Sequence, residues 1–337
     1  MKNILTISAV VLLVGVISTS IVAMNAEQPK SATLAENAIK LDDTPLAGYR
    51  PTRISDHMWV VHGPLEQPNP ENAGFMNNPA FMITDKSVVV IDPGGSRQVG
   101  EGLLALIRMQ TDKPVTHIFN SHVHGDHWLG NHAFKKAFPS VAIYAHPEMI
   151  NQAENGEAES WLTLMETLTE GKTAGTEAVI PAIELEDGQT IKIDGLSIKI
   201  HLNDWAHTKT DAMFVLEEDR VLLTGDNALF GRIARMDDGS FRGNIAVLDA
   251  ALEYPIDTVV PGHGKTATKE ELKLFRDYLD ILYSEAARLM EEGQEAFEMK
   301  DTIGKKLAVY KDWSGFDKEL GKHISLAVLE AEQADFE

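Results

Sequence analysis

Residues 121–127 (SHVHGDH) constrain this chain more than any other stretch of it. Four metal-binding side chains, His122, His124, Asp126 and His127, fall within six residues in the pattern H-x-H-x-D-H. Three imidazoles and a carboxylate this close together are unfavourable in an apolar core and suit a metal ion, and these ligand types favour zinc, iron or manganese over calcium. The alternative interpretation is a polar turn that happens to be rich in histidine.

The sequence around this motif predicts a loop between a strand and a helix. Residues 115–120 (VTHIFN) are typical of a buried strand, and residues 128–138 have the composition of a helix. Folds of the α/β class place their chemistry on such loops at the carboxyl ends of strands. We therefore expect the motif to lie at a functional edge of a sheet.

The rest of the chain predicts an α/β fold in which strands and helices alternate and then give way to hairpins. Asp187-Gly188 and Asp194-Gly195 are both typical of hairpin turns. The spacing of Trp161, Leu164, Met165 and Leu168 indicates helix packing rather than a binding surface. Further strands are expected at residues 58–61, 80–83, 87–91, 141–145, 189–193, 196–202, 212–217, 220–224 and 258–260, and helices at 98–109, 147–171, 245–253, from 268 onward, at 303–310 and at 316–331.

Three more ligand-type residues follow predicted strands. His207 lies in the sequence WAHT, Asp226 in LTGD and His263 in PGHG. A single histidine at the end of a strand is usually structural. Three ligand-type residues in such places, after an H-x-H-x-D-H motif, indicate that one metal centre draws on distant parts of the chain.

Composition narrows the chemistry and the partners. The chain has 337 residues and no cysteine, which excludes disulfides, thiolate ligands and cysteine nucleophiles, so a metal must be held by His, Asp or Glu. The formal net charge of -21 repels phosphate backbones. We therefore expect a small-molecule substrate and no nucleic-acid partner.

The N-terminus predicts export. Residues 1–26 combine a short positive start with a long apolar run and small residues, as a signal peptide cleaved near Ala23 or Ala26 does. An uncleaved anchor is the less favoured alternative. No second apolar run is long enough to span a membrane, so the expected location is periplasmic or secreted. Residues 27–46 are polar and unpatterned, which predicts a linker.

Together these motifs resemble the metallo-β-lactamase fold superfamily. The resemblance covers residues 49–265 and carries five motifs in the family's order: the strand that ends in Asp92, the loop 121–127, and then His207, Asp226 and His263. It implies an αββα sandwich over residues 47–267. Residues 268–337 would then form a helical C-terminal extension.

The resemblance also implies two divalent metal ions, zinc ahead of iron or manganese, held by seven side chains: His122, His124 and His207 for the first ion, Asp126, His127 and His263 for the second, and Asp226 between them. Such ions lower the pKa of a bound water, and the resulting metal-bound hydroxide would be the nucleophile. Asp126 could also accept a proton and is the candidate catalytic residue, although a ligating carboxylate is a poor base.

The branch of the superfamily stays open at this point. Asp226 in its T-G-D context resembles glyoxalase II and the lactonases, whereas predicted export favours a β-lactamase or another envelope enzyme. The expected function is therefore an exported dinuclear hydrolase that opens a small ester, thioester, lactone or β-lactam. The alternative is a non-hydrolytic iron protein of the same fold, either persulfide dioxygenase-like or a redox accessory.

The substrate is expected to be chosen by loops. Residues 63–79 form a loop that could overhang the site, and residues 227–244 follow Asp226 directly. In the second loop we assign Phe230, Arg232 and Arg235 as candidate substrate contacts, with one arginine pairing with a substrate carboxylate. The alternative is that these arginines pair with nearby surface acids, namely Asp237 and Asp238.

Three assignments have more than one interpretation. Trp128 either lines the cleft or packs the following helix. Asp92 either orients a metal-binding histidine or, as the favoured alternative, forms a turn. The helical tail could serve as a lid or as a homodimer interface, but its single apolar stripe favours a role in covering the sandwich.

Overall fold

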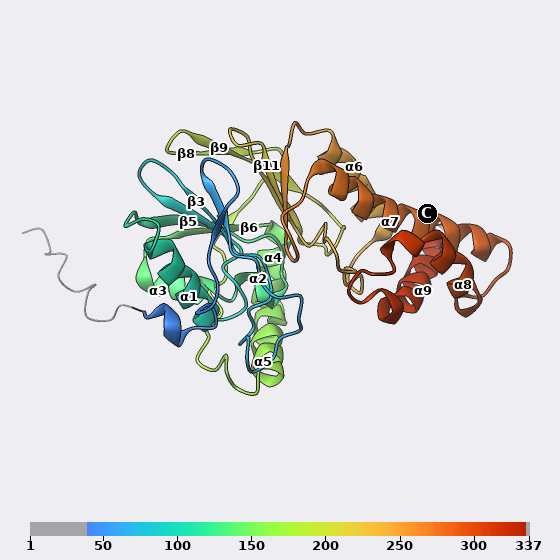
Figure 1. Cartoon of the computed structure of the whole chain (residues 1–337), viewed down its shortest axis with the longest axis horizontal. Coiled ribbons are helices and arrows are strands. Elements are labelled where there is room, and N and C mark those ends of the chain that lie inside the picture. The colour runs from blue at the N-terminus through green and yellow to red at the C-terminus, as the bar shows by residue number, and fades with distance from the viewer. Residues whose placement is uncertain (1–38, 335–337) are drawn as a thin grey trace, which may run out of the picture. The chain divides into compact units, whose positions relative to one another are not determined.

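The structure is a computed structural model that describes residues 39–334, so the predicted signal peptide and most of the predicted linker lie outside the described residues. Two sheets form its centre (Figure 1). The first sheet follows chain order: β1 (Thr52–Arg53), β2 (Met58–Val60), β3 (Ala80–Ile83), β4 (Val88–Ile91), β5 (Val115–Phe119), β6 (Ala142–Ala145) and β7 (Ile183–Glu184). The second has the order β12 (Thr258–Pro261), β11 (Val221–Gly225), β10 (Ala212–Leu216), β9 (Leu196–Leu202) and β8 (Thr190–Ile193).

The described helices flank these sheets. They are η1 (Leu41–Asp43), α1 (Arg97–Arg108), α2 (Gly125–Trp128), α3 (Asn131–Ala137), α4 (Pro147–Gln152), a π-helical turn η2 (Ala153–Glu157), α5 (Ala158–Leu168), α6 (Phe241–Leu252), α7 (Lys269–Glu291), α8 (Ala296–Lys306), η3 (Ala308–Tyr310) and α9 (Phe316–Ala334). Local signals explain several ends. The Ser96 hydroxyl accepts a hydrogen bond from Val99 N at the start of α1, and Thr268 with Glu271 forms a capping box at the start of α7.

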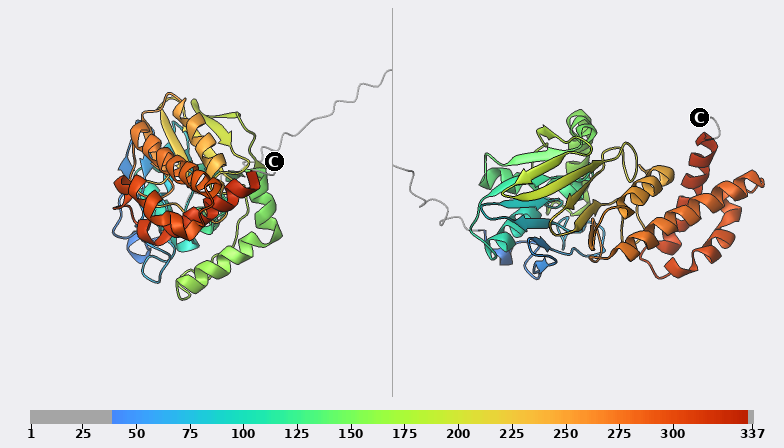
Figure 2. Two further views of the ribbon diagram at one scale, coloured as in Figure 1. Left: turned by 90° about the vertical axis from the view of Figure 1, so that its right-hand side faces the viewer. Right: turned by 90° about the horizontal axis from the view of Figure 1, so that it is seen from above.

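Apolar layers between these elements confirm the predicted αββα sandwich. The inner faces of the two sheets share one buried cluster, to which Phe119 of β5 and Phe214 of β10 both belong. The outer face of the first sheet packs on α1 and α3. The outer face of the second sheet packs on α6 and α7. In the right view of Figure 2, the C-terminal helices, orange to red, extend beyond one end of the sheets.

The C-terminal helices continue the apolar layer over the second sheet: α7 packs on α6 and β12, and α8 and α9 pack on α7 and on each other. Residues of α7, α8 and α9 share one buried cluster with α6 and the outer face of that sheet. His323 of α9 also links the layers, because its Nδ1 lies 2.9 Å from the Tyr278 hydroxyl and its Nε2 lies 2.9 Å from Ala234 O. The tail is therefore continuous with the sandwich rather than a separate unit.

Three local predictions were wrong. The expected helix 147–171 is broken where Asn155 and Gly156 leave the helical region, with φ of 121° at Gly156, and α5 ends at Leu168. Asp194-Gly195 does turn between β8 and β9, with positive φ at both residues, but Asp187-Gly188 connects a strand of the first sheet to one of the second. The helix expected at 303–310 begins earlier, at Ala296.

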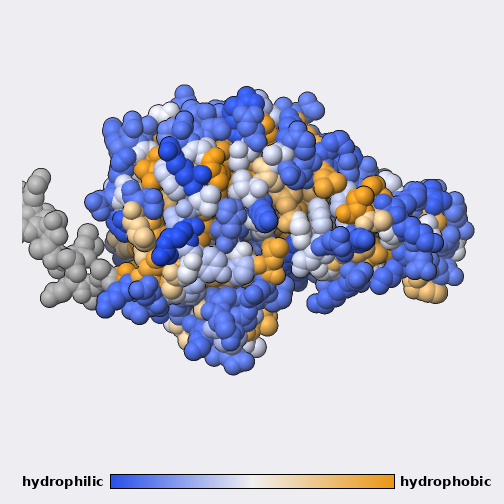
Figure 3. Space-filling view, viewed as in Figure 1, coloured by the Kyte–Doolittle hydropathy of each residue, from blue (hydrophilic) through white to orange (hydrophobic). Residues whose placement is uncertain are grey.

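The packed body also begins before residue 47. Leu46, placed in the predicted linker, is fully buried, and Gly102 of α1 approaches its side chain so closely that an added Cβ would lie 3.0 Å from Leu46 Cβ. Within residues 39–334, we find no helix with the length and apolarity needed to cross a bilayer. Polar residues cover most of the face shown in Figure 3, in line with the acidic composition.

Candidate metal centre

The ends of four strands bring the predicted ligands to one edge of the sandwich. The parallel strands β4 and β5 end together, before Asp92 and before the 121–127 loop. The parallel strands β11 and β12 likewise end just before Asp226 and His263. Because parallel strands point their carboxyl ends the same way, distant segments meet here.

His207 reaches this edge from the loop between β9 and β10. Hydrogen bonds fasten that loop to the motif: Val123 N donates to Thr210 Oγ1 at 3.0 Å, and Ala212 N donates to Ser121 O at 2.7 Å. The loop thus holds His207 over the motif although no regular strand carries it.

The structure brings all seven predicted ligands together in two groups. Within each group, one ligand atom per residue lies within 4.8 Å of the others, and all seven residues are buried. The first group contains His122, His124, His207 and Asp226, and the second contains Asp126, His127 and His263.

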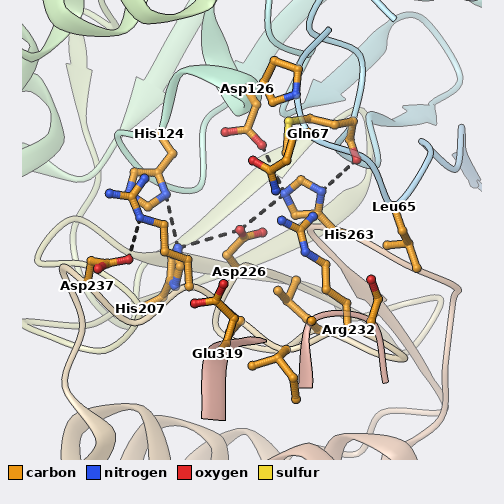
Figure 4. Close-up of a pocket in the computed structure, with 18 of the residues that line it drawn as sticks. Leu65, Gln67, His124, Asp126, His207, Asp226, Arg232, Asp237, His263 and Glu319 are labelled. Carbon is orange, nitrogen blue, oxygen red and sulfur yellow. Dashed lines mark hydrogen bonds and ion pairs between the residues drawn. The ribbon is translucent and has the colours of Figure 1, made fainter. Parts of the chain in front are cut away.

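Asp226 lies between the two groups (Figure 4). Its Oδ2 is 3.7 Å from His207 Nε2 on one side and 3.4 Å from His263 Nε2 on the other. Its Oδ1 is 3.3 Å from His127 Nε2. One carboxylate therefore reaches both groups, as a bridging ligand must.

Unpaired polar atoms show that these residues fit metal ions. His122 Nε2, His127 Nε2, His207 Nδ1 and Asp226 Oδ1 are buried and make no hydrogen bond, although His127 Nε2 and Asp226 Oδ1 lie 3.3 Å apart. Most buried polar groups in proteins are hydrogen-bonded, so four exceptions in one place need an explanation. Imidazole nitrogens and carboxylate oxygens at this density are the donor set that zinc and related divalent ions take.

Asp92 orients the motif from behind. Its carboxylate accepts hydrogen bonds from Ser121 N at 2.8 Å, from Ser121 Oγ at 2.6 Å and from His127 Nδ1 at 2.9 Å. The favoured turn interpretation was thus incomplete: the residue does have a positive φ of 49°, but its side chain holds a candidate ligand in place. A buried carboxylate behind a ligating imidazole fixes the ring and its tautomer.

Three further contacts lie behind the ligands, and none of them was predicted from the sequence. His263 Nδ1 lies 2.7 Å from Met76 O, a backbone atom for which no side-chain signal exists. His124 Nε2 lies 3.3 Å from Asp238 Oδ2, which was considered only as a surface acid. His122 Nδ1 contacts Oγ of the adjacent Ser121 at 2.9 Å.

Protonation differs between the two groups in the metal-free site. Burial lowers the pKa of His122 well below 6.5 and lowers that of His207 to about 3. Burial opposes protonation of His127 and His263 too, but nearby carboxylates, Asp126 and Asp226, outweigh it and raise both pKa values above 6.5. The same two histidines hold the pKa of Asp226 well below its usual value despite its burial.

Asp126 remains ionised at this centre. Burial raises its pKa, but the charges and hydrogen bonds of His127 and His263 outweigh burial and hold it below its usual range. Its Oδ2 lies 3.1 Å from His263 Nε2, within the second group. This position suits a ligand, and the low pKa makes Asp126 a weak proton acceptor.

Two glycines allow the strand ends to close on the site. A Cβ at Gly262 would lie 1.9 Å from Asp226 Oδ1, so a side chain there would collide with the shared carboxylate. Gly225 has a positive φ of 51°, and a Cβ there would lie 2.8 Å from the Ser121 side chain.

The candidate ligands open into a cavity of about 730 Å³. Both predicted loops line it, together with α5 and residues 314–322 at the start of α9. Arg232 and Arg235 lie in its wall, as predicted for substrate contacts. Trp161, Leu164 and Leu168 lie there as well, so their helical spacing was misinterpreted as packing alone.

Two predicted substrate contacts do not reach the cavity. Trp128 is fully buried, and its indole N–H donates to Val123 O at 2.8 Å, so it packs α2 against α4 and α5. Phe230 is 8% exposed and belongs to the apolar cluster beneath the C-terminal helices. Both side chains are large and apolar, and burial is the more favourable use of them.

Comparison with known proteins agrees with this architecture. The family model for the metallo-beta-lactamase superfamily matches residues 73–263. Among curated proteins, an atrochrysone carboxyl ACP thioesterase from Emericella nidulans is 23% identical over 75% of this chain and 71% of its own length. A hydroxyacylglutathione hydrolase from Prochlorococcus marinus is 27% identical over 52% of this chain and 59% of its own length.

Solved structures share the fold at low sequence identity. A metallo-beta-lactamase from Pontibacter korlensis superimposes with a TM-score of 0.56 at 18% identity, over 69% of this chain and 99% of that chain. The sec-alkylsulfatase Pisa1 from Pseudomonas sp. superimposes with a TM-score of 0.64 at 16% identity, over 86% of this chain and 52% of that one.

Proposed function

The chain belongs to the metallo-beta-lactamase superfamily, and on that premise we propose that it is an exported, two-metal hydrolase of thioesters or closely related carboxyl esters. The observation that carries the proposal is Asp226, whose carboxylate lies within reach of both groups of imidazoles. The names of the thioesterase and of the hydroxyacylglutathione hydrolase favour thioesters within the superfamily.

The reaction is a simple hydrolysis. The oxygen of water bonds to the acyl carbon, the bond from that carbon to sulfur breaks, and one proton of water leaves with the thiol. When bound, two divalent ions would supply a water of lowered pKa and a positive charge opposite the developing oxyanion.

The protein's own residues prepare the site for that chemistry. Asp92 and Met76 O fix the rings of His127 and His263, so the nitrogens that face the centre are preoriented. Asp226 places one carboxylate between both groups, which sets where two ions would lie with respect to each other. Zinc is the proposed metal because His and Asp donors without sulfur still suit it well.

Export is part of the proposal and rests on the sequence of residues 1–26 alone. The persulfide dioxygenase-like iron protein is the competing function. The same donor set would hold iron, but the named relatives support hydrolysis.

The deciding experiment loads the chain from residue 27 onward with zinc and counts the metal by mass spectrometry. S-phenyl thiopentanoate, an acyl-homoserine lactone and a cephalosporin are then offered in parallel. We expect two zinc ions per chain and fastest turnover of the thioester, abolished by chelation and restored by zinc. One iron per chain with oxygen uptake and no hydrolysis would favour the iron protein instead.

A further inference from the structure

We propose that the substrate is an amphipathic anion, with a carboxylate near the scissile bond that binds Arg232 and an apolar remainder that lies along α5. This inference rests on the proposed hydrolysis and narrows its substrate class. It is carried by the charges and apolar side chains that line the cavity.

Arg232 is firmly placed at the inner part of the cavity. Its backbone forms an isolated β-bridge with Ser314, and the flanking hydrogen bonds are Ile233 N to Ser314 O and Ser314 N to Gly231 O, both 2.9 Å. Figure 4 shows the guanidinium group directed toward the side of the cavity that Asp226 and His263 form. The segment before α9 thus fixes where this positive charge lies.

The guanidinium group lacks a protein partner where it is buried. Arg232 Nη1 is inaccessible to solvent and has no hydrogen bond. A buried donor left without an acceptor is destabilising, and a charged donor more so. The side chain as a whole is half-buried and lines the cavity, so a substrate carboxylate there would balance its charge.

The other cations of the cavity wall already have partners. Arg235 Nε lies 2.9 Å from Asp237 Oδ2, and Lys322 pairs with the same Asp237. Lys318 Nζ lies 3.8 Å from Glu319 Oε1. Among the cations that line this cavity within residues 39–334, Arg232 therefore differs in having no ion pair. The predicted pairing with surface acids holds for Arg235 and not for Arg232.

Bound metal ions would leave the centre beside Arg232 positively charged. Two divalent ions would bring four positive charges, of which the two carboxylates, Asp126 and Asp226, neutralise two. An unpaired guanidinium group beside a centre that stays positive is repelled by it, unless an anion lies between them. A planar carboxylate accepts two parallel hydrogen bonds from a guanidinium group and meets this requirement.

The outer wall of the same cavity is apolar. Leu65, Leu164 and Leu168 line it although they are 41%, 40% and 41% exposed, and Trp161 lies beside them. Leu164 and Leu168 are one turn apart on α5 and therefore present one surface. Large apolar side chains that remain exposed around a cavity mark a place for an apolar ligand.

The test compares two thioesters of equal chain length on the zinc-loaded chain. S-phenyl thiopentanoate is neutral, and the mono-S-phenyl thioester of glutaric acid carries a terminal carboxylate. Arg232→Gln removes the proposed anion partner. Lys305→Gln is the matched control, because it removes one positive charge from an exposed side chain on α8 that does not line this cavity.

We expect wild type to prefer the glutaric thioester. Arg232→Gln should lower kcat/KM for that substrate by about 10- to 100-fold and change the neutral substrate by less than about threefold. Lys305→Gln should change both by less than about threefold. An equal effect of Arg232→Gln on both thioesters, with metal content intact, would overturn the assignment and leave the proposed hydrolysis standing.

A binding measurement separates failure of this inference from failure of the proposed function. Decanoate has the anion and the apolar chain but no scissile bond. Calorimetry on the zinc-loaded chain should give a Kd that rises about tenfold or more in Arg232→Gln and stays unchanged in Lys305→Gln. If neither thioester is hydrolysed but this difference persists, the hydrolase proposal fails and the anion site stands. An unchanged Kd for decanoate in Arg232→Gln would show that Arg232 does not bind the carboxylate.

Discussion

Both groups of the metal centre are buried, but they differ in what holds their histidines and in the pKa values of those histidines. In the second group, His127 and His263 are held from behind by Asp92 and a backbone carbonyl, and nearby carboxylates raise the pKa of both rings without metal. In the first group, burial keeps His122 and His207 neutral, and the support behind them is weaker. The first group is thus chemically ready for a metal, whereas the second is rigid but must release protons first.

Removing what the two groups share should have the largest effect. Asp226→Ala removes a member of the first group whose carboxylate also lies 3.3 Å and 3.4 Å from the imidazole nitrogens of His127 and His263 in the second. We expect zinc content to fall below one per chain and kcat/KM for thioesters to fall by about a thousandfold or more. Mass spectrometry and steady-state kinetics check this. The matched control is Asp301→Ala, an exposed carboxylate on α8, which should leave both quantities unchanged. Full activity in Asp226→Ala would disprove the two-metal assignment.

A change behind the second group should separate the two groups. Asp92→Asn keeps the shape of the side chain but removes the charge that faces His127 Nδ1. We expect the second zinc to bind about 10- to 100-fold more weakly. The first should be weakened less, because Asp92 reaches His122 only through the Ser121 hydroxyl. A zinc titration followed by calorimetry should therefore change from one steep phase to two. Equal weakening of both phases would argue against separate support for the two groups.

Lowering the pH should empty the second group before the first. The pKa values of His127 and His263 are raised in the metal-free site, so protons compete with metal there, whereas the lowered values of His122 and His207 remove that competition. From about pH 8 to about pH 6, we expect zinc content to move from two ions toward one. Equilibrium dialysis at fixed free zinc measures this, and simultaneous loss of both ions would contradict it.

The metal-free protein should show the opposite trend in stability. A histidine whose pKa is raised on folding stabilises the folded state below its unfolded pKa of about 6.5, and that contribution is lost as pH rises through the folded value. The difference in Tm between zinc-loaded and metal-free protein should therefore grow with pH above about 6.5. Thermal unfolding with and without chelator gives both curves.

The smallest effect is expected behind the first group. Asp238 is 53% exposed at its side chain and lies 3.3 Å from His124 Nε2, so water screens its charge. Asp238→Asn should reduce zinc affinity and kcat/KM by less than about fivefold. A loss as large as that of Asp92→Asn would show that the two groups are supported equally.

Much of this architecture could be predicted from the sequence because its signals are local. The sandwich could be predicted from the buried strands and from the hairpin turn at Asp194-Gly195. The convergence of His207, Asp226 and His263 could be predicted because each follows the end of a predicted strand. The signal at Asp187-Gly188 failed because a turn dipeptide does not tell which sheet the next strand will join.

The remaining errors concern side chains whose roles depend on tertiary contacts. Trp128 and Phe230 have the chemistry of a cleft residue and of a core residue alike, and only the packing decides between them. Arg232 and Arg235 lie three residues apart in one loop, yet Arg235 forms an ion pair with Asp237 and Nη1 of Arg232 has no hydrogen-bond partner. The partner of His263 is a backbone oxygen, and such a contact cannot be predicted from residue types.

The bridge between Arg232 and Ser314 has a consequence for the order in which the protein matures. During synthesis, every candidate metal ligand leaves the ribosome before residues 314–322, which complete the wall of the cavity. A nascent chain could therefore acquire its metal before it can position a substrate. Catalysis on the intended substrate would begin only when the last helix has docked.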